Sequence, residues 1–297
     1  MSDPAIPDDV VGAFQIDGEP VRGRVVRLGP AIDEVLRGHA YPEPVANLLG
    51  EACALAALVG SNLKFEGRLI VEARGAGAVR YVVADYDTSG GLRGYCRFDA
   101  AEVEAASGGF QRPGAKSLLG EGVFMMTVDQ GAAMDRYQGV TDIQGETLAL
   151  CAEQYFAQSE QTPTRVRLAV GGEGGAWRAG GFLVQYIADD DARGSTQEAW
   201  TRTQAFFETI GEDELLDADL SSNRLLFRLF HEDGVRVFGS KPLRAFCRCS
   251  QERIETVLKS FDAAERDEMV EPDGKIRVTC EYCSRVYAVE PGVLASA

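Results

Sequence analysis

The chain has 297 residues, 45% of them hydrophobic, which is enough to bury a substantial core and to form more than one domain. Its formal net charge is −16 at pH 7, whereas nucleic-acid phosphates require clustered Lys and Arg, so the composition argues against a nucleic-acid binder. No stretch approaches about 18 consecutive apolar residues, so we expect no membrane span.

The first region, residues 1–187, is predicted to be an α+β domain with an antiparallel sheet. Runs rich in β-branched residues, separated by Gly-rich turns, predict strands at 68–74, 79–85, 92–98, 123–128 and 165–170. The spacing of apolar residues predicts helices over 45–59 and 147–156 that cover this sheet. The polar stretch 100–120, rich in small residues, is predicted to be a loop.

The second region, residues 188–240, is predicted to be a metastable helical linker. Ser195 followed by Glu198 forms a capping-box pattern, and Ser221 is placed to cap a second helix. Helices this short depend on docking against a neighbour, and we expect the C-terminal region to support them. An ordinary interdomain connector is the alternative interpretation. The apolar linker residues expected to be buried, and to offer apolar contacts to other proteins after release, are Trp200, Phe206, Phe207, Leu225, Leu226 and Phe230.

The third region, residues 241–297, contains the most informative pattern, a C-x-C pair (Cys247 and Cys249) followed by a C-x-x-C pair (Cys280 and Cys283). Four thiolates at one point form a closed tetrahedral zinc site with no open position for substrate water, so the pattern indicates a structural metal. The extended runs on either side of the C-x-x-C pair, and the turn signal at 272–274, are typical of a zinc-knuckle hairpin.

The C-x-C pair also suggests a redox function. Oxidation of Cys247 and Cys249 would close a small, strained ring, and strained disulfides are the labile and regulatory ones. A zinc ribbon that only stabilises its own small domain is the alternative. Apolar spacing over 254–261, and the pair Asp262 and Glu265, predict two short helices between the cysteine pairs. Because such a domain has a small core, zinc should supply much of its folding free energy, on the order of 10–16 kcal/mol in comparable peptides.

The other three cysteines lie singly in apolar segments. Cys53, Cys96 and Cys151 are predicted to be small buried hydrophobes. An odd number of cysteines and the lack of a signal-peptide pattern at the start of the sequence indicate a reducing cytoplasm.

Three other functional classes fit the residues less well. A thiol–disulfide oxidoreductase requires its C-x-x-C at a helix N-terminus, and a zinc hydrolase requires His or carboxylate ligands, whereas His39 and His231 are far apart in sequence. A zinc-ribbon adaptor or nucleic-acid module would need a basic stripe. The sequence has no G-x-x-x-x-G-K-[ST] phosphate loop, which is consistent with action without ATP.

The cysteine pattern and several further segments, in the same order along the chain, resemble the family of 33-kDa redox-regulated heat-shock chaperones. These segments are His39–Pro42, Pro44–Val45, Leu63–Gly67, Arg136–Val140, Tyr155–Phe156, Ser159–Thr164, Gly180–Gln185 and Leu226–Glu232. Ser284 differs from the family, which often has Gly after the last cysteine, and residues 100–112 match no family pattern.

The resemblance implies a chaperone and not an enzyme. Reduced family members hold one zinc ion with all four thiolates and are inactive. On oxidation the disulfides would be Cys247–Cys249 and Cys280–Cys283. The metal is then released, the zinc domain and linker unfold, protomers dimerise, and unfolding client proteins are held without ATP.

Overall fold

The computed structural model describes residues 8–64, 66–108, 113–131, 134–172, 175–187 and 196–294. The chain forms two compact units, Met1–Ala245 and Phe246–Ala297. The predicted linker helices therefore belong to the first compact unit. The expected start of the linker and its predicted cap Ser195 lie outside the described residues.

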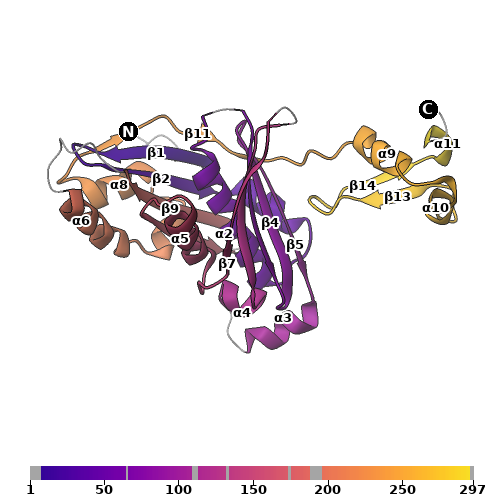
Figure 1. Ribbon diagram of the computed structural model, residues 1–297, viewed down its shortest axis with the longest axis horizontal. Helices are drawn as coiled ribbons and strands as arrows, with labels where there is room; N and C mark the ends of the chain where they lie inside the picture. Colours follow the sequence, from indigo (N-terminus) through magenta and orange to yellow (C-terminus); the bar gives the residue numbers. More distant parts are fainter. Residues whose placement is uncertain are drawn as a thin grey trace. The chain divides into compact units, whose positions relative to one another are not determined.

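The first unit contains two six-stranded sheets, seen in Figure 1. Sheet A has the order β10-β1-β2-β9-β8, with β11 also paired to β1, and sheet B has the order β12-β5-β4-β3-β6-β7. All pairs are antiparallel except β12 with β5. The strands of sheet A are β1 Val10–Ile16, β2 Val21–Leu28, β8 Thr164–Gly171, β9 Arg178–Tyr186, β10 Val235–Val237 and β11 Lys241–Pro242. Those of sheet B are β3 Arg68–Gly75, β4 Val79–Asp87, β5 Gly91–Phe98, β6 Gly122–Asp129, β7 Tyr137–Asp142 and β12 Arg244–Ala245.

The five strands predicted from the sequence are confirmed as β3, β4, β5, β6 and β8. The two predicted helices are confirmed as α2 (Glu43–Gly60) and α5 (Leu148–Ser159). Sequence reasoning missed β1 and β2, which hold the face on which the linker docks.

Helix α2 is the central element of the first unit, because it packs against strands of both sheets. By length and composition it could cross a membrane, but 72% of that apolar window is buried inside the protein. It belongs to the larger hydrophobic core, together with the short helix α1 (Pro30–Arg37) and α5. Its apolar character is therefore explained by burial between two sheets.

The prediction of a loop over residues 100–120 is wrong in part. Helix α3 (Ala100–Ser107) begins there, and the Asp99 side chain accepts hydrogen bonds from the amides of Ala101 and Glu102. Helix α4 (Ala115–Leu119) follows. Small alanine-rich stretches form helices readily once capped, and burial of Val103 anchors the first of them.

The linker forms α6 (Thr196–Glu208), α7 (Glu212–Leu216) and α8 (Ser222–Phe230). The predicted cap of α8 is confirmed, because the Ser221 hydroxyl accepts a hydrogen bond from the Arg224 amide. These helices cover one face of sheet A, and α2 covers the other face. Together with sheet A the linker helices form a second hydrophobic core.

The second unit is small. It contains α9 (Gln251–Lys259), α10 (Ala263–Glu268), the hairpin of β13 (Ile276–Thr279) and β14 (Val286–Val289), and α11 (Pro291–Leu294). The predicted capping box of Asp262 and Glu265 is confirmed. The buried core consists of Leu258, Ile276, Val289 and Leu294.

Candidate metal centre

The hairpin β13–β14 positions the C-x-x-C pair. Its register aligns Thr279 with Val286, so Cys280 and Cys283 lie in the connection between the strands. The Cys280 amide donates to the carbonyl of Arg285, and the Ser284 amide donates to the carbonyl of Cys280. This tight turn is the predicted zinc knuckle.

Ser284 adopts the left-handed backbone conformation, with φ of 55°. Glycine is preferred at such a position because it lacks the Cβ that makes this region unfavourable. A glycine at position 284 would therefore close this turn with less backbone strain than the serine of this chain.

The C-x-C pair lies just before α9. The hydroxyl of Ser250 caps this helix by accepting a hydrogen bond from the Arg253 amide. Leu258 of α9 packs against Ile276 and Val289 of the hairpin. This apolar contact brings the segment of Cys247 and Cys249 to the knuckle.

The four sulfur atoms meet at one point, all within 4.8 Å of one another. Sγ of Cys247 lies 3.6 Å from Sγ of Cys280, and Sγ of Cys249 lies 3.4 Å from Sγ of Cys283. A zinc ion with Zn–S bonds of about 2.3 Å would place its four sulfurs about 3.8 Å apart. The donor set and its spacing therefore fit zinc, and all four cysteines are free thiols.

A tyrosine contacts one of these sulfurs. The hydroxyl of Tyr287, on β14, donates a hydrogen bond of 3.0 Å to Sγ of Cys249. Burial opposes ionisation of Cys249, but hydrogen bonds from Tyr287 and from the neighbouring thiols outweigh it and lower its pKa to about 7. Burial raises the pKa of Cys283 to about 12. The cluster thus favours a thiolate at Cys249 even before a metal is considered.

The remaining cysteines are buried in the first unit, as predicted. Burial raises the pKa of Cys53 to about 12 and also raises the pKa values of Cys96 and Cys151. Cys53 and Cys96 are isolated in sequence but not in space, since the charge of one raises the pKa of the other. Thiols held protonated in an apolar interior are poor nucleophiles.

The six linker residues singled out from the sequence come together on one surface. Five are buried and Phe206 is partly buried, and their partners include Phe14, Val25 and Phe182 of sheet A. Phe230 packs between Phe14 and Phe206, with ring centroids 5.8 and 5.9 Å away. The expectation that the C-terminal region buries these residues is therefore wrong, because the apolar face of sheet A does so.

Two polar contacts that sequence reasoning missed also hold the linker. Arg27 on β2 is 1% exposed, and its guanidinium donates to the carbonyls of Glu214 at 3.1 Å and Asp217 at 2.9 Å. Arg178 on β9 donates to the carbonyl of Leu216 at 2.8 Å. Both arginines donate to carbonyl groups at or directly after the C-terminus of α7, where a helix leaves carbonyls without intrahelical partners. No sequence signal singled out Arg27, because β2 also carries Arg22 and Arg24.

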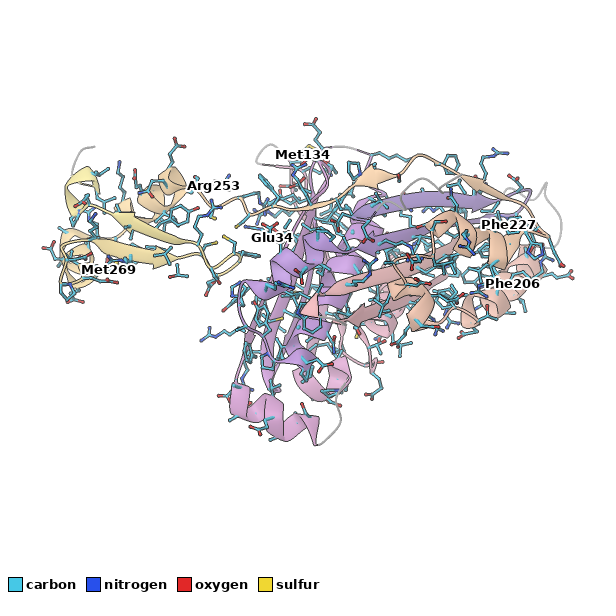
Figure 2. The ribbon with its side chains drawn as sticks, turned by 180° about the vertical axis from the view of Figure 1, so that it is seen from behind. Glu34, Met134, Phe206, Phe227, Arg253 and Met269 are labelled. Carbon is cyan, nitrogen blue, oxygen red and sulfur yellow. The ribbon has the colours of Figure 1, made fainter. Side chains whose placement is uncertain are left out.

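Not all apolar side chains of the linker are covered. Phe227 on α8, labelled in Figure 2, is 67% exposed. Its ring contacts His231 at a centroid distance of 5.3 Å.

Comparisons with known proteins agree on one family. The family model described as Hsp33 protein matches residues 9–290. The protein named 33 kDa chaperonin from Caulobacter vibrioides (strain NA1000 / CB15N) is 73% identical over 293 residues, covering 97% of each chain. That of Azotobacter vinelandii is 38% identical over 283 residues, covering 94% of this chain and 91% of its own. The crystal structure of the 33 kDa chaperonin from Thermotoga maritima shares the fold, with a TM-score of 0.81, 24% identity and 96% coverage of both chains.

Proposed function

Since the chain belongs to the Hsp33 family of chaperones, we propose that it is a redox-regulated holdase that acts without ATP. In this proposal the reduced protein holds one zinc ion and is inactive in the reducing cytoplasm. Oxidation converts it to a form that binds unfolding proteins and prevents their aggregation.

The observation that carries the proposal is the convergence of four free thiols in a unit with a very small core. Among the described residues of that unit, the buried hydrophobic cluster has four members, and Tyr287 is the one other buried hydrophobic side chain. When bound, zinc would cross-link the C-x-C segment to the hairpin and supply folding free energy. The stability of the unit would then depend on the redox state of Cys247, Cys249, Cys280 and Cys283.

The oxidation step is a conversion of thiolates to disulfides. Two molecules of hydrogen peroxide accept four electrons from the four thiolates and take up four protons, which yields two disulfides and four water molecules. From the family resemblance we propose the pairs Cys247–Cys249 and Cys280–Cys283. Each disulfide removes two metal ligands, so the metal leaves as Zn²⁺ and its contribution to folding is lost.

Release of the linker is proposed to follow. Once the second unit unfolds, Phe246 begins a disordered segment, and the short strands that precede it can fray as a chain terminus does. Helices α7 and α8 are too short to persist without docking. Their release would uncover the apolar residues of both the linker and sheet A, which we propose contact clients and stabilise a dimer of oxidised protomers.

The direct test is aggregation of a heat-denatured client, followed by light scattering with zinc-bound reduced protein or with peroxide-treated protein. Suppression only after peroxide is expected. Equal suppression in both states would leave a chaperone without this redox switch. No suppression in either state would refute the holdase and favour a zinc-ribbon adaptor.

A further inference from the structure

One edge of sheet A is covered by the segment that leads to the metal centre. We call this segment, Val235–Ala245, the strap. It pairs with β1 through β10, where Gln15 aligns with Arg236, and through β11, where Val11 aligns with Lys241. Its last two residues pair with β5 of sheet B.

Backbone hydrogen bonds fix the strap along the full length of β1. The Phe238 amide donates to the carbonyl of Ala13 at 2.9 Å, and the Leu243 amide donates to the carbonyl of Asp9 at 2.6 Å. Directly before the strap, the carbonyl of Gly234 accepts a hydrogen bond of 3.0 Å from the Asp17 amide. The strap therefore satisfies edge groups of β1 that would otherwise face solvent.

The strand beneath the strap lacks the usual protection of an edge strand. Exposed edges generally carry charged residues or proline, which oppose pairing with another chain. The seven residues of β1 are VVGAFQI, with no charged residue and no proline. Without the strap, β1 would offer an uncharged, extended template for another strand.

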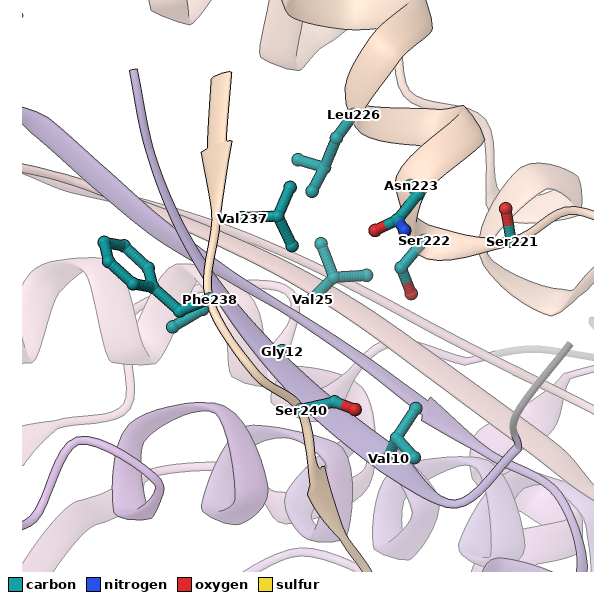
Figure 3. A pocket seen from close by; sticks show the side chains of 11 residues that line it. Val10, Gly12, Val25, Ser221, Ser222, Asn223, Leu226, Val237, Phe238 and Ser240 are labelled. Carbon is teal, nitrogen blue, oxygen red and sulfur yellow. The ribbon is translucent and has the colours of Figure 1, made fainter. Parts of the chain in front are cut away.

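The middle of the strap is loosely packed. Its pairing strands have only three and two residues, and Val237 and Phe238 are 43% and 47% exposed. A cavity of about 180 Å³ lies between the strap, β1 and α8 (Figure 3). Its apolar lining comes from Val10, Val25, Leu226 and Val237, among other residues. Leu243 is buried in the larger core and anchors the C-terminal part of the strap. Exposed apolar side chains beside an unfilled space place residues 237–240 at the low end of local stability.

The strap ends two residues before Cys247. While the second unit is folded, the C-terminal end of the strap is joined directly to a folded unit and is restrained. When that unit unfolds, this restraint is lost, and the end frays more readily because it keeps only the burial of Leu243 and a two-residue pairing with β5 among its backbone and core contacts. The redox state of the cysteines is thus coupled to coverage of the β1 edge.

We propose that the strap is a removable cover, and that the uncovered edge of β1 binds an extended segment of an unfolding polypeptide as an added strand. This inference deepens the proposed holdase function and rests on it. Strand addition uses backbone hydrogen bonds, so it accepts segments of many sequences, as a chaperone for diverse clients requires. The recess lined by Val10, Val25 and Leu226 would take apolar side chains that alternate along the bound strand.

Hydrogen exchange at single-amide resolution tests the inference on the full chain. The amides of Ala13, Gln15 and Asp17 point to the strap, whereas those of Phe14 and Ile16 point to β2, because antiparallel strands alternate in this way. Oxidation should speed exchange of the first set about tenfold or more and leave the second set protected. Adding reduced, carboxymethylated lysozyme, which is permanently unfolded, should restore protection to the first set.

A substitution gives an independent measurement. Gln15→Pro removes one N–H group that points to the strap. Proline is tolerated at such a position of an edge strand, so the pairing of β1 with β2 should remain intact. Gln15→Ala removes the same side chain and keeps the amide. We expect the oxidised proline variant to suppress client aggregation several-fold less well than the alanine variant.

The outcomes separate the inference from the function on which it rests. If oxidised wild-type protein fails to suppress aggregation, the holdase itself is refuted. If it suppresses aggregation while the Ala13, Gln15 and Asp17 amides stay protected on oxidation, the strap is not released and the inference is wrong. If these amides lose protection and do not regain it when the client is bound, β1 is not the docking edge, which also overturns the inference.

Discussion

The hydroxyl of Tyr287 donates a 3.0 Å hydrogen bond to Sγ of Cys249, and so joins the hairpin of the C-terminal unit to the C-x-C pair. Tyr287 lies two residues after the turn of the knuckle and is 8% exposed. Such contacts orient metal ligands and reduce the electron density on the sulfur that accepts the hydrogen bond.

The Tyr287→Phe variant should therefore bind one zinc ion per chain, as the wild-type protein should, and release it faster during peroxide treatment. Without the hydrogen bond, the metal-bound Cys249 thiolate is more nucleophilic toward peroxide. A colorimetric zinc chelator should record release that is several-fold faster than in wild-type protein. Tyr137→Phe, which loses a contact to Glu160 in the first unit, is the matched control. Equal release rates for both variants would show that the Tyr287 hydroxyl has no influence on oxidation.

Loss of the metal should unfold the second unit and leave the core of the first unit intact. Changing both Cys280 and Cys283 to Ser removes two of four thiolates, and a core of four residues cannot replace metal binding on the order of 10 kcal/mol. Hydrogen exchange should be fast over residues 246–294 and slow in α2.

The same variant separates a switch from a structural metal. If the metal controls the linker, exchange and proteolysis should also increase over residues 196–245. A linker as protected in this variant as in the zinc-bound protein would mean that the metal stabilises only its own unit.

Docking of α7 on sheet A can be disrupted from the sheet side. A Cβ at Gly180 on β9 would lie 2.3 Å from the carbonyl oxygen of Leu215, so Gly180→Ala should displace α7 at a cost of about 1–3 kcal/mol. Because the linker is then released in part without oxidant, the reduced variant should already suppress client aggregation. Limited proteolysis should cut it more rapidly over residues 196–230.

Gly181→Ala is the control, since its Cβ points to the opposite face and meets Leu58 and Leu168. It should lower the free energy of unfolding while the linker stays protected and the reduced protein stays inactive. If both reduced variants suppress client aggregation to the same extent, the activity of Gly180→Ala comes from general destabilisation and not from release of the linker.

The buried cysteines should be dispensable for the switch. Their thiols are held protonated by burial, which raises the pKa of Cys53 to about 12 and also raises those of Cys96 and Cys151. A triple alanine variant that remains folded by circular dichroism should release zinc on peroxide treatment at the wild-type rate. Slower release would identify one of these thiols as part of the sensor.

The sequence by itself determined the features that depend on neighbouring residues. The spacing of the cysteine pairs predicted their ligand chemistry, and the strands beside Cys280 and Cys283 predicted the hairpin that holds them. The caps Ser221 and Asp262 were also found correctly, because a cap bonds an amide three residues away. Helix α2 followed from the period of its apolar residues.

Only the tertiary structure decided where the linker docks and what covers β1. Arg27 meets Asp217 at the end of α7 across 190 positions of sequence, and the strap reaches β1 from 219 or more positions away. Such pairings depend on which faces and edges the folded sheets leave open, and no local period or spacing records that. The apolar residues of α6 and α8 predicted that these helices would be buried, but their partner, sheet A, was set by the way distant strands assemble into one surface.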